Sequence, residues 1–158
     1  MCLVDQINYY KYLCGMKQEY IDQIRAFNRF YTKILGVLNK SYLGSEFGLP
    51  EIRVIQDVYL HPNRNAKEIS SELNMDKGLL SRILKKLEAR KYIYREKAMN
   101  DNRMEFVRLT KHGEEVYHTL NMAANQSVEE IFAGLDESRL QEIVKSMKTI
   151  FSLMTNNN

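Results

Sequence analysis

Two short amphipathic helices separated by a tight turn constrain the fold more than any other feature of this sequence. Apolar residues at helical spacing predict a helix over residues 66–73, and Asn65 with Glu68 forms a capping-box pattern at its start. Residues 74–76 form the turn, and Asp76 can cap a second helix that ends near residues 90–91. The second helix carries an i, i+3, i+4, i+7 stripe made of Leu80, Ile83, Leu84 and Leu87. Together they predict a helix-turn-helix motif.

A β-hairpin is predicted directly after this motif. Residues 92–97 and 104–109 are rich in aromatic, β-branched and alternating side chains, which is typical of strands. Between them, residues 98–102 have the composition of a hairpin loop. A two-stranded hairpin that follows a helix-turn-helix is a wing.

Long helices are predicted on both sides of the winged segment. Apolar residues share one helix face over residues 17–39, and Pro50 begins a further helix that runs to about residue 60. Thr110 can cap a helix over residues 111–133, and Asp136 can cap another over residues 137–154. In the last helix a seam suited to a bundle or a dimer interface consists of Leu140, Ile143, Met147, Ile150 and Met154.

These elements predict a mainly α fold with a small β-hairpin wing. We expect one domain over residues 1–158, with a DNA-binding lobe over residues 49–110 and dimerisation helices over residues 17–45 and 111–154. Charge is divided unevenly along it: residues 62–111 hold 13 Lys and Arg against 7 Asp and Glu, or +6, whereas the remainder holds 10 against 13, or −3. A concentrated positive charge suits a segment that binds a polyanion, although a merely solvated basic face is the alternative.

The second helix of the motif presents a basic row opposite its apolar stripe. Lys77, Ser81 and Lys85 form one row, and Gly78, Arg82 and Lys86 lie beside it. In a DNA major groove, Arg or Lys can donate to guanine O6 and N7, and Lys can neutralise phosphates. The glycine would allow close approach of the backbone to DNA. An ordinary amphipathic helix with a basic solvent face is the alternative interpretation.

Asp101 and Arg103 stand one residue apart at the predicted wing tip. The carboxylate can hold the guanidinium in the direction needed to enter a minor groove. Arg95 and Asn100 complete the candidate wing contacts. Alternatively, the aspartate closes its own turn and the arginine lies in solvent.

Three segments in this order resemble the MarR family of bacterial regulators. They are residues 76–82 of the basic helix, residues 101–103 of the wing tip and residues 109–113 at the start of the next helix, within a resemblance over about residues 17–154. The resemblance implies a homodimer joined through its N- and C-terminal helices and bound to a pseudo-palindromic operator. Geometry places the half-sites of such a dimer about one helical turn, roughly 34 to 36 Å, apart. It also implies a repressor, since most of the family act by occluding promoters.

Residues 21–31 resemble the opening of the MarR-type half of bacterial fusions to GNAT-type acetyltransferases. The chain is therefore either a stand-alone relative or the DNA-binding part of such a fusion. A winged-helix protein-interaction module that does not bind DNA is a further alternative. In peroxide- or quinone-sensing family members an early cysteine is the switch, but Cys14 lies too far upstream of Pro50 to match it. Both cysteines, Cys2 and Cys14, precede the first predicted helix, so no disulfide framework is expected.

The family also responds to small molecules, and a small aromatic or phenolic effector is expected to bind in a cleft. Candidate lining residues are Phe27, Phe30, Tyr31 and Phe47, although helical spacing alone would place each of them in a packed core. We expect no enzyme, cofactor or metal, because His61, His112 and His118 are scattered and no phosphate loop occurs. No apolar run approaches the roughly 18 residues of a membrane span, so a cytoplasmic protein is expected.

Overall fold

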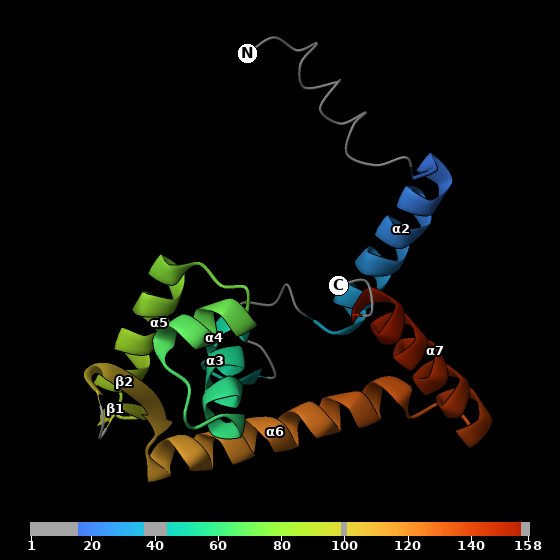
Figure 1. Cartoon of the computed structure of the whole chain (residues 1–158). Helices are drawn as coiled ribbons and strands as arrows, with labels where there is room; N and C mark the ends of the chain where they lie inside the picture. Colours follow the sequence, from blue (N-terminus) through green and yellow to red (C-terminus); the bar gives the residue numbers. More distant parts are fainter. Residues whose placement is uncertain (1–15, 37–43, 99–100, 156–158) are drawn as a thin grey trace. The chain divides into compact units, whose positions relative to one another are not determined.

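The computed structural model describes residues 16–36, 44–98 and 101–155, except for the side chains of residues 98 and 101–103. It divides into two compact units, Met1–Lys40 and Ser41–Asn158, and each is described here by itself. The helices and strands are shown in Figure 1. The expected division into one lobe and two dimerisation segments stays a prediction.

The N-terminal unit contains helix α2, Gln18–Ile34. The predicted helix over residues 17–39 is too long, because the backbone turns at Gly36, which has a φ of 62°. The amide of Leu35 still donates to the carbonyl of Tyr31 at 3.0 Å, and the amide of Gly36 donates to Lys33 at 3.1 Å. A left-handed glycine of this kind is a common way for a helix to end. All of α2 is described, and none of its residues is buried.

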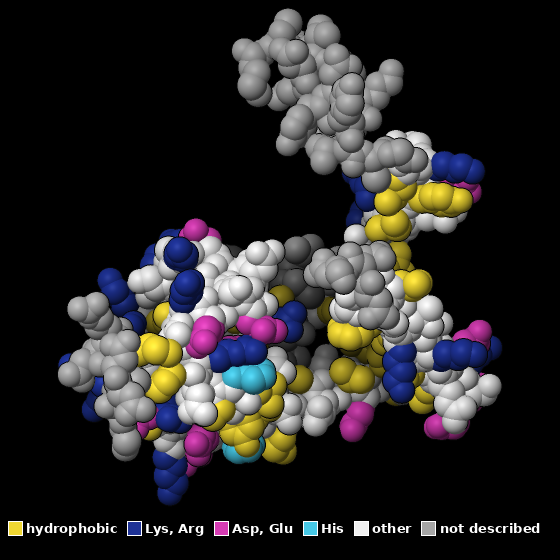
Figure 2. All heavy atoms as spheres, viewed as in Figure 1, with side chains coloured by type: hydrophobic (Ala, Val, Ile, Leu, Met, Phe, Trp, Pro, Cys, Tyr) yellow, Lys and Arg dark blue, Asp and Glu magenta, His cyan; other side chains and the backbone are white. Residues whose placement is uncertain are grey.

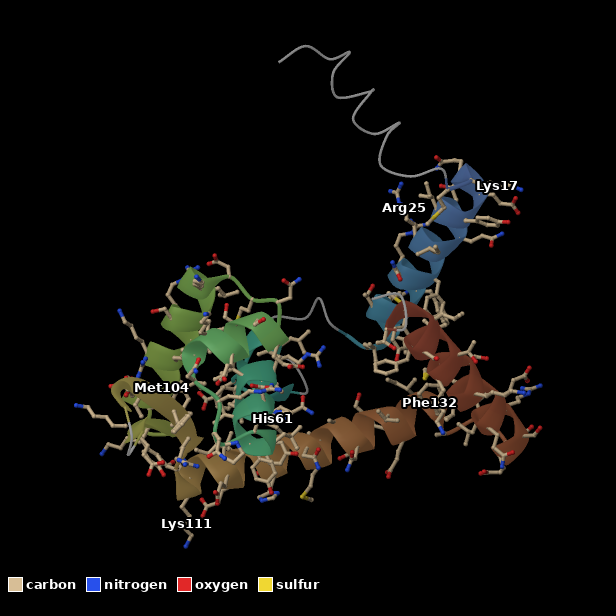
Figure 3. All side chains as sticks on the ribbon, viewed as in Figure 1. Lys17, Arg25, His61, Met104, Lys111 and Phe132 are labelled. Atoms are coloured by element: carbon tan, nitrogen blue, oxygen red, sulfur yellow. The ribbon has the colours of Figure 1, made fainter. Side chains whose placement is uncertain are left out.

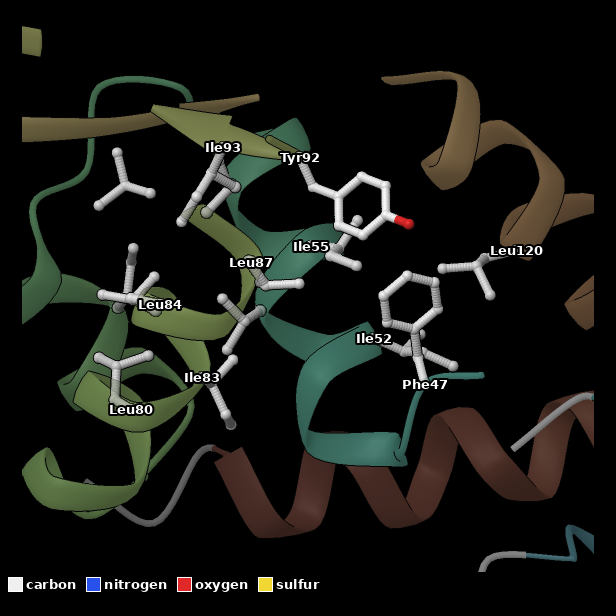
Figure 4. Packing of buried hydrophobic residues seen from close by; sticks show 14 residues of the cluster. Phe47, Ile52, Ile55, Leu80, Ile83, Leu84, Leu87, Tyr92, Ile93 and Leu120 are labelled. Atoms are coloured by element: carbon white, nitrogen blue, oxygen red, sulfur yellow. The ribbon is translucent and has the colours of Figure 1, made fainter. Parts of the chain in front are cut away.

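The second unit begins with helices α3 (Leu49–Leu60), α4 (Ala66–Glu72) and α5 (Lys77–Ala89), followed by strands β1 (Ile93–Ala98) and β2 (Asp101–Leu109). With the start of α6 they form what we call the winged lobe. Its core lies between α3, α5 and the hairpin, as Figure 4 shows for several members. The predicted apolar stripe of α5 is confirmed, since all four of its residues are at most 5% exposed.

Side-chain caps fix where these helices begin. The Asn65 carboxamide accepts from the amides of Lys67 at 2.9 Å and Glu68 at 3.0 Å, while the Glu68 carboxylate accepts from the Asn65 amide at 2.8 Å. Asp76 accepts from the amides of Gly78 and Leu79 at the start of α5. The predicted capping box and N-cap are therefore confirmed, and both orient the two helices through local bonds.

The hairpin is antiparallel and pairs Ile93 with Leu109 at its base. The predicted loop over residues 98–102 is too wide, because Ala98 pairs with Asp101 after a register shift between Lys97 and Ala98. Such a shift lets the pairing continue toward the tip. The wing is tied to the motif by a hydrogen bond from the Val107 amide to the Arg64 carbonyl at 3.1 Å.

Helices α6 (Lys111–Phe132) and α7 (Glu137–Thr155) follow. Figure 3 marks both ends of α6. The Thr110 hydroxyl accepts from the Gly113 amide at 3.0 Å, which confirms the predicted cap, and the Asp136 carboxylate accepts from the Arg139 amide at 2.9 Å. Only Gly113 and Leu120 of α6 are buried among its described residues, and no residue of α7 is. The start of α6 thus belongs to the lobe core, whereas in the predicted seam of α7 Met147, Ile150 and Met154 are exposed and Leu140 and Ile143 are only half-buried.

Candidate nucleic-acid interface

Helix α5, the second helix of the motif and the predicted DNA-reading helix, carries its buried apolar stripe and its basic residues on opposite faces. Opposite the buried stripe, all six predicted DNA-contact residues are exposed: Lys77, Gly78, Ser81, Arg82, Lys85 and Lys86. Lys and Arg side chains gather over this part of the molecule and the wing in Figure 2. The α5 surface therefore offers a helix-wide basic face that its own core does not use.

The cations of this face differ in how far they are already neutralised. Lys86 forms an ion pair with Glu51 of α3, with Nζ 2.6 Å from Oε1. Arg95 of the wing lies between two carboxylates, 3.4 Å from Glu88 and 3.6 Å from Glu105. These two predicted DNA contacts therefore also hold α5 against α3 and the wing.

The remaining cations of α5 are less engaged. Lys77 and Lys85 form no ion pair with any residue in the described part of the chain. The Arg82 Nε donates to the Gly78 carbonyl one turn earlier, at a long 3.4 Å. These three charges and the Ser81 hydroxyl are the groups most available to an external anion.

A groove of about 350 Å³ runs between α4, α5 and β1. Its polar lining includes Lys77, Ser81 and Arg95, and it adds Lys67 and Ser70 of α4, which the sequence reasoning missed. Lys67 is exposed, but its single charge on a seven-residue helix gave no pattern that pointed to a site. The Ser70 hydroxyl already donates to the Met75 carbonyl at 2.8 Å, so Lys67 is the more available of the two.

The structure gives a reason for a glycine at position 78 that differs from the predicted one. A Cβ built on it would lie 3.0 Å from Oδ1 of Asp76, the carboxylate oxygen that caps α5. A side chain here would therefore crowd the cap. Its expected role in close approach to DNA stays a prediction.

The wing tip is only partly described. Asn100 lies outside the described residues, and of Asp101 and Arg103 only the backbone is described, as the start of β2. Their predicted interaction and minor-groove role stay predictions. Nearer the base, Arg108 forms an ion pair with Glu96 and donates to Asn63 at 3.2 Å, so this wing cation is engaged within the chain.

A polar cluster lies where α5 meets the wing. The Glu46 carboxylate, just before α3, accepts a 3.0 Å hydrogen bond from the Tyr92 hydroxyl and forms an ion pair with Arg90. The bond from Tyr92 and then that from Arg90 hold the pKa of the Glu46 carboxyl below its usual range. Burial, followed by the bond to Glu46, raises the pKa of the Tyr92 phenol. Sequence reasoning missed this cluster, because Glu46 is more than forty positions from both Arg90 and Tyr92.

The candidate effector residues lie in different settings. Phe47 is 4% exposed and packs edge-on against Tyr92, with ring centroids 5.5 Å apart, so it belongs to the lobe core. In α2, Phe27 is 50% exposed and Phe30 is 59% exposed. The Phe27 ring stacks on that of the partly buried Tyr31, with centroids 5.7 Å apart. That these four side chains line one cleft stays a prediction.

Other chemistry receives no support from the described residues. Among them, no group of three or more His, Cys, Asp or Glu side chains is arranged to hold a metal ion. None of the described helices is long and apolar enough to cross a membrane. Cys2 and Cys14 lie outside the described residues.

Comparison with known families identifies the lobe. The sequence model of the MarR family matches residues 48–104, from the start of α3 to the wing. Residues 48–104 therefore form a MarR-type segment. Among curated regulators it is 27% identical over 100 residues to BilQ of Clostridioides difficile, covering 62% of this chain and 68% of that one. It is 28% identical over 102 residues to MgrA of Staphylococcus aureus, covering 65% of each. The chain thus spans about two thirds of the length of these relatives.

Solved structures agree on the fold. FabT of Streptococcus pneumoniae, crystallised in complex with DNA, superposes with a TM-score of 0.72 at 20% identity, covering 88% of this chain and 99% of that one. Wild-type MarR of Escherichia coli in its apo form gives 0.69 at 20% identity, covering 80% and 94%. The predicted winged helix-turn-helix class is confirmed. MarR-type regulators are not enzymes, so the comparisons also confirm that prediction.

Proposed function

We propose that this chain is a sequence-specific DNA-binding regulator of the MarR type. One observation carries the proposal: α5 presents Lys77, Ser81, Arg82 and Lys85 on one exposed face, opposite a stripe that is fully used by the core. An α-helix of this kind fits the major groove. Lys67 and Lys77 border a groove next to this face and are suited to phosphates on the same duplex.

Residues of α5 divide into base-reading and phosphate-binding roles in this proposal. Arg82, with its planar donor fork, is assigned to a guanine edge, and Lys85 to a phosphate. Arg103 is assigned to the flanking minor groove from the wing. Affinity should fall steeply with salt, since several phosphates are neutralised in each half-site.

Electrophoretic mobility shifts with fragments from neighbouring promoters test the proposal. Arg82→Ala should weaken specific binding by about 1 to 3 kcal/mol and relax discrimination at one base pair. Lys85→Ala and Lys86→Ala form a matched pair, because the first lysine has no described ion-pair partner and the second is held by Glu51. We expect the salt slope to fall by about one for Lys85→Ala, and by less for Lys86→Ala. A wild-type chain without preference among fragments at moderate salt would refute the function.

We further propose that the regulator acts as a homodimer on a pseudo-palindromic operator. The described parts of α2 and α7 bury no side chain, although α7 exposes Val144, Ile150 and Phe151 by 48%, 47% and 71%. A helix face with several exposed large apolar side chains ordinarily marks an interface between proteins. Sedimentation should show a dimer for the wild type and for Lys145→Asp, which alters a polar position of α7, but a monomer for Ile150→Asp. A wild-type monomer at micromolar concentration would argue against this assembly.

Repression that responds to a small aromatic or phenolic effector completes the proposal. It is supported by the MarR-type segment and by the half-exposed aromatic face of α2. A thermal-shift screen of phenolic compounds tests it, because a ligand that binds only the folded protein raises the melting temperature. A hit should also release DNA in the mobility-shift assay, and a screen without a hit that does so would contradict this part of the proposal.

A further inference from the structure

We propose that Glu46 is a positioning residue for DNA recognition, which holds the C-terminal end of the reading helix α5 and the start of the wing in one fixed arrangement. The inference rests on the proposed DNA-binding function. Glu46 lies outside α5 and the wing, in the segment that leads into α3. Its carboxylate nonetheless contacts the two residues that delimit the turn between them, Arg90 and Tyr92.

The turn that Glu46 holds connects both DNA-binding elements. Arg90 is the C-cap of α5, and the amide of Tyr92 donates to the Leu87 carbonyl of the last helical turn at 2.9 Å. The Tyr92 carbonyl in turn accepts from the Thr110 amide at 3.0 Å, where the second wing strand ends. A shift of Tyr92 would therefore change the angle between the reading helix and the wing. That angle decides whether both can reach their grooves together.

Glu46 itself is held by the core. The next residue, Phe47, is 4% exposed and packs against the Tyr92 ring, and in Figure 4 the Tyr92 hydroxyl points out of this cluster. Next to it, the Gly48 amide donates to the Glu51 carboxylate at 2.8 Å, and Glu51 also pairs with Lys86 of α5. The segment before α3 and the first turn of α3 thus place two carboxylates, those of Glu46 and Glu51, against the last turn of the reading helix and its C-cap.

The sign of the effect on DNA affinity separates positioning from simple electrostatics. Glu46 is a negative charge on a surface proposed to bind a polyanion, and its removal also frees the Arg90 guanidinium. If charge alone mattered, Glu46→Gln would bind DNA more tightly. A positioning role requires the opposite, because the bonds that fix the turn are weakened while the cations of α5 remain.

The test is a DNA titration of the full-length chain with wild type, Glu46→Gln and the control Glu114→Gln. Glu114 is an exposed carboxylate of α6 with no ion pair among the described residues, so its variant reports charge removal alone. We expect Glu46→Gln to weaken specific binding about three- to tenfold, the equivalent of one lost hydrogen-bonding group, with an unchanged salt slope. Glu114→Gln should bind as tightly as the wild type or more tightly. Equal or tighter binding by Glu46→Gln would overturn the proposal.

A second measurement does not need DNA and keeps the two proposals separable. In the free protein, Glu46→Gln should accelerate hydrogen exchange of the Tyr92 amide and lower the pKa of its phenol, followed by NMR with the signal assigned through Tyr92→Phe. Unchanged exchange and an unchanged phenol pKa would show that Glu46 does not hold the turn, whatever the DNA result. Wild-type chain that fails to bind DNA, with these NMR changes present, would refute the proposed function and with it the recognition role, but not the clamp itself.

A charge exchange between Glu46 and Arg90 provides a final test. Arg90→Glu places two carboxylates together and should weaken DNA binding, whereas the double variant Glu46→Arg, Arg90→Glu has the wild-type net charge. We expect the double variant to bind DNA more tightly than the summed effects of Glu46→Arg and Arg90→Glu would give, because it restores the pair. Additive effects of the two single variants would count against coupling between these positions.

Discussion

The winged lobe and helix α7 contain the same kind of apolar sequence pattern, but the apolar residues are buried in the lobe and exposed in α7. In both α5 and α7, apolar residues recur at steps of three and four. The α5 stripe is covered by the rest of the lobe core, including α4 and β1, and Leu84 is 1% exposed, whereas Ile150 and Met154 of α7 are 47% and 76% exposed. Periodicity therefore predicts that a helix face will be covered, but not whether the same chain covers it. The lobe covers its own apolar stripe, whereas in the homodimer proposed above a second copy would cover the exposed face of α7.

Substitution of one glycine in each region should give the largest difference in unfolding free energy. A Cβ at Gly113, at the start of α6, would lie 2.0 Å from the Tyr92 carbonyl oxygen, whereas one at Gly134, between α6 and α7, would meet nothing within 4 Å. We expect Gly113→Ala to cost about 3 kcal/mol or more of unfolding free energy, because backbone must move. Gly134→Ala should change it by less than about 0.5 kcal/mol. Urea unfolding followed by circular dichroism measures both, and similar values would contradict the contrast.

Truncation of one leucine in each region gives the next largest effect. Leu84→Ala should destabilise the lobe by about 2 to 5 kcal/mol at any protein concentration, since it opens a cavity in the core. Leu153 of α7 is 66% exposed in the single chain. Leu153→Ala should therefore lower stability only at concentrations where the chain dimerises, because the lost contacts lie between copies. Thermal melts over a hundredfold concentration range test this, and a concentration-independent loss for Leu153→Ala would contradict it.

Removal of one helix cap in each region should give a smaller difference in stability. Asn65→Ala removes the acceptor of two amides at the start of α4 and should cost the lobe about 1 kcal/mol. Asp136→Ala removes a similar cap from α7. In dilute protein we expect it to fray α7 without lowering the unfolding midpoint of the lobe. Hydrogen exchange resolved by residue distinguishes the two, and a drop in lobe midpoint for Asp136→Ala would show that α7 unfolds with the lobe.

Features set by neighbouring residues were predictable from the sequence. The caps of Asn65, Asp76 and Thr110 each depend on amides two or three residues away, so residue type and spacing suffice. The end of α2 was misjudged although its signal is equally local, because apolar periodicity continues past Gly36 to Leu38. There the conformational preference of glycine outweighed the pattern of side chains.

Features that join distant residues were not predictable. Glu46 and Arg90 are 44 positions apart, and Glu51 and Lys86 are 35 apart, so no spacing rule connects them. Lys86 and Arg95 stay predicted DNA contacts, and their ion-pair partners on α3 and β2 depend on the packed fold. The width of the hairpin loop depended in the same way on a register shift that composition does not encode.

The smallest effect, a pH dependence confined to the lobe, follows from the Glu46 cluster. The folded pKa of Glu46 is below its ordinary value of 4.5, chiefly through the bond from Tyr92. Its contribution to stability is therefore present above about pH 4.5 and is lost as the pH falls through the lower folded pKa. The pKa of Tyr92 is raised above 10.0, chiefly by burial, so the stability that Tyr92 contributes is present below pH 10.0 and is lost as the pH rises through the folded value.

Urea titrations from acid to alkaline pH should show that Glu46→Gln and Tyr92→Phe both reduce the loss of stability at acid pH. Only Tyr92→Phe should abolish the alkaline contribution, because burial of the phenol persists without Glu46. An alkaline limb that disappears equally in both variants would mean that the carboxylate, and not burial, dominates the shift at Tyr92.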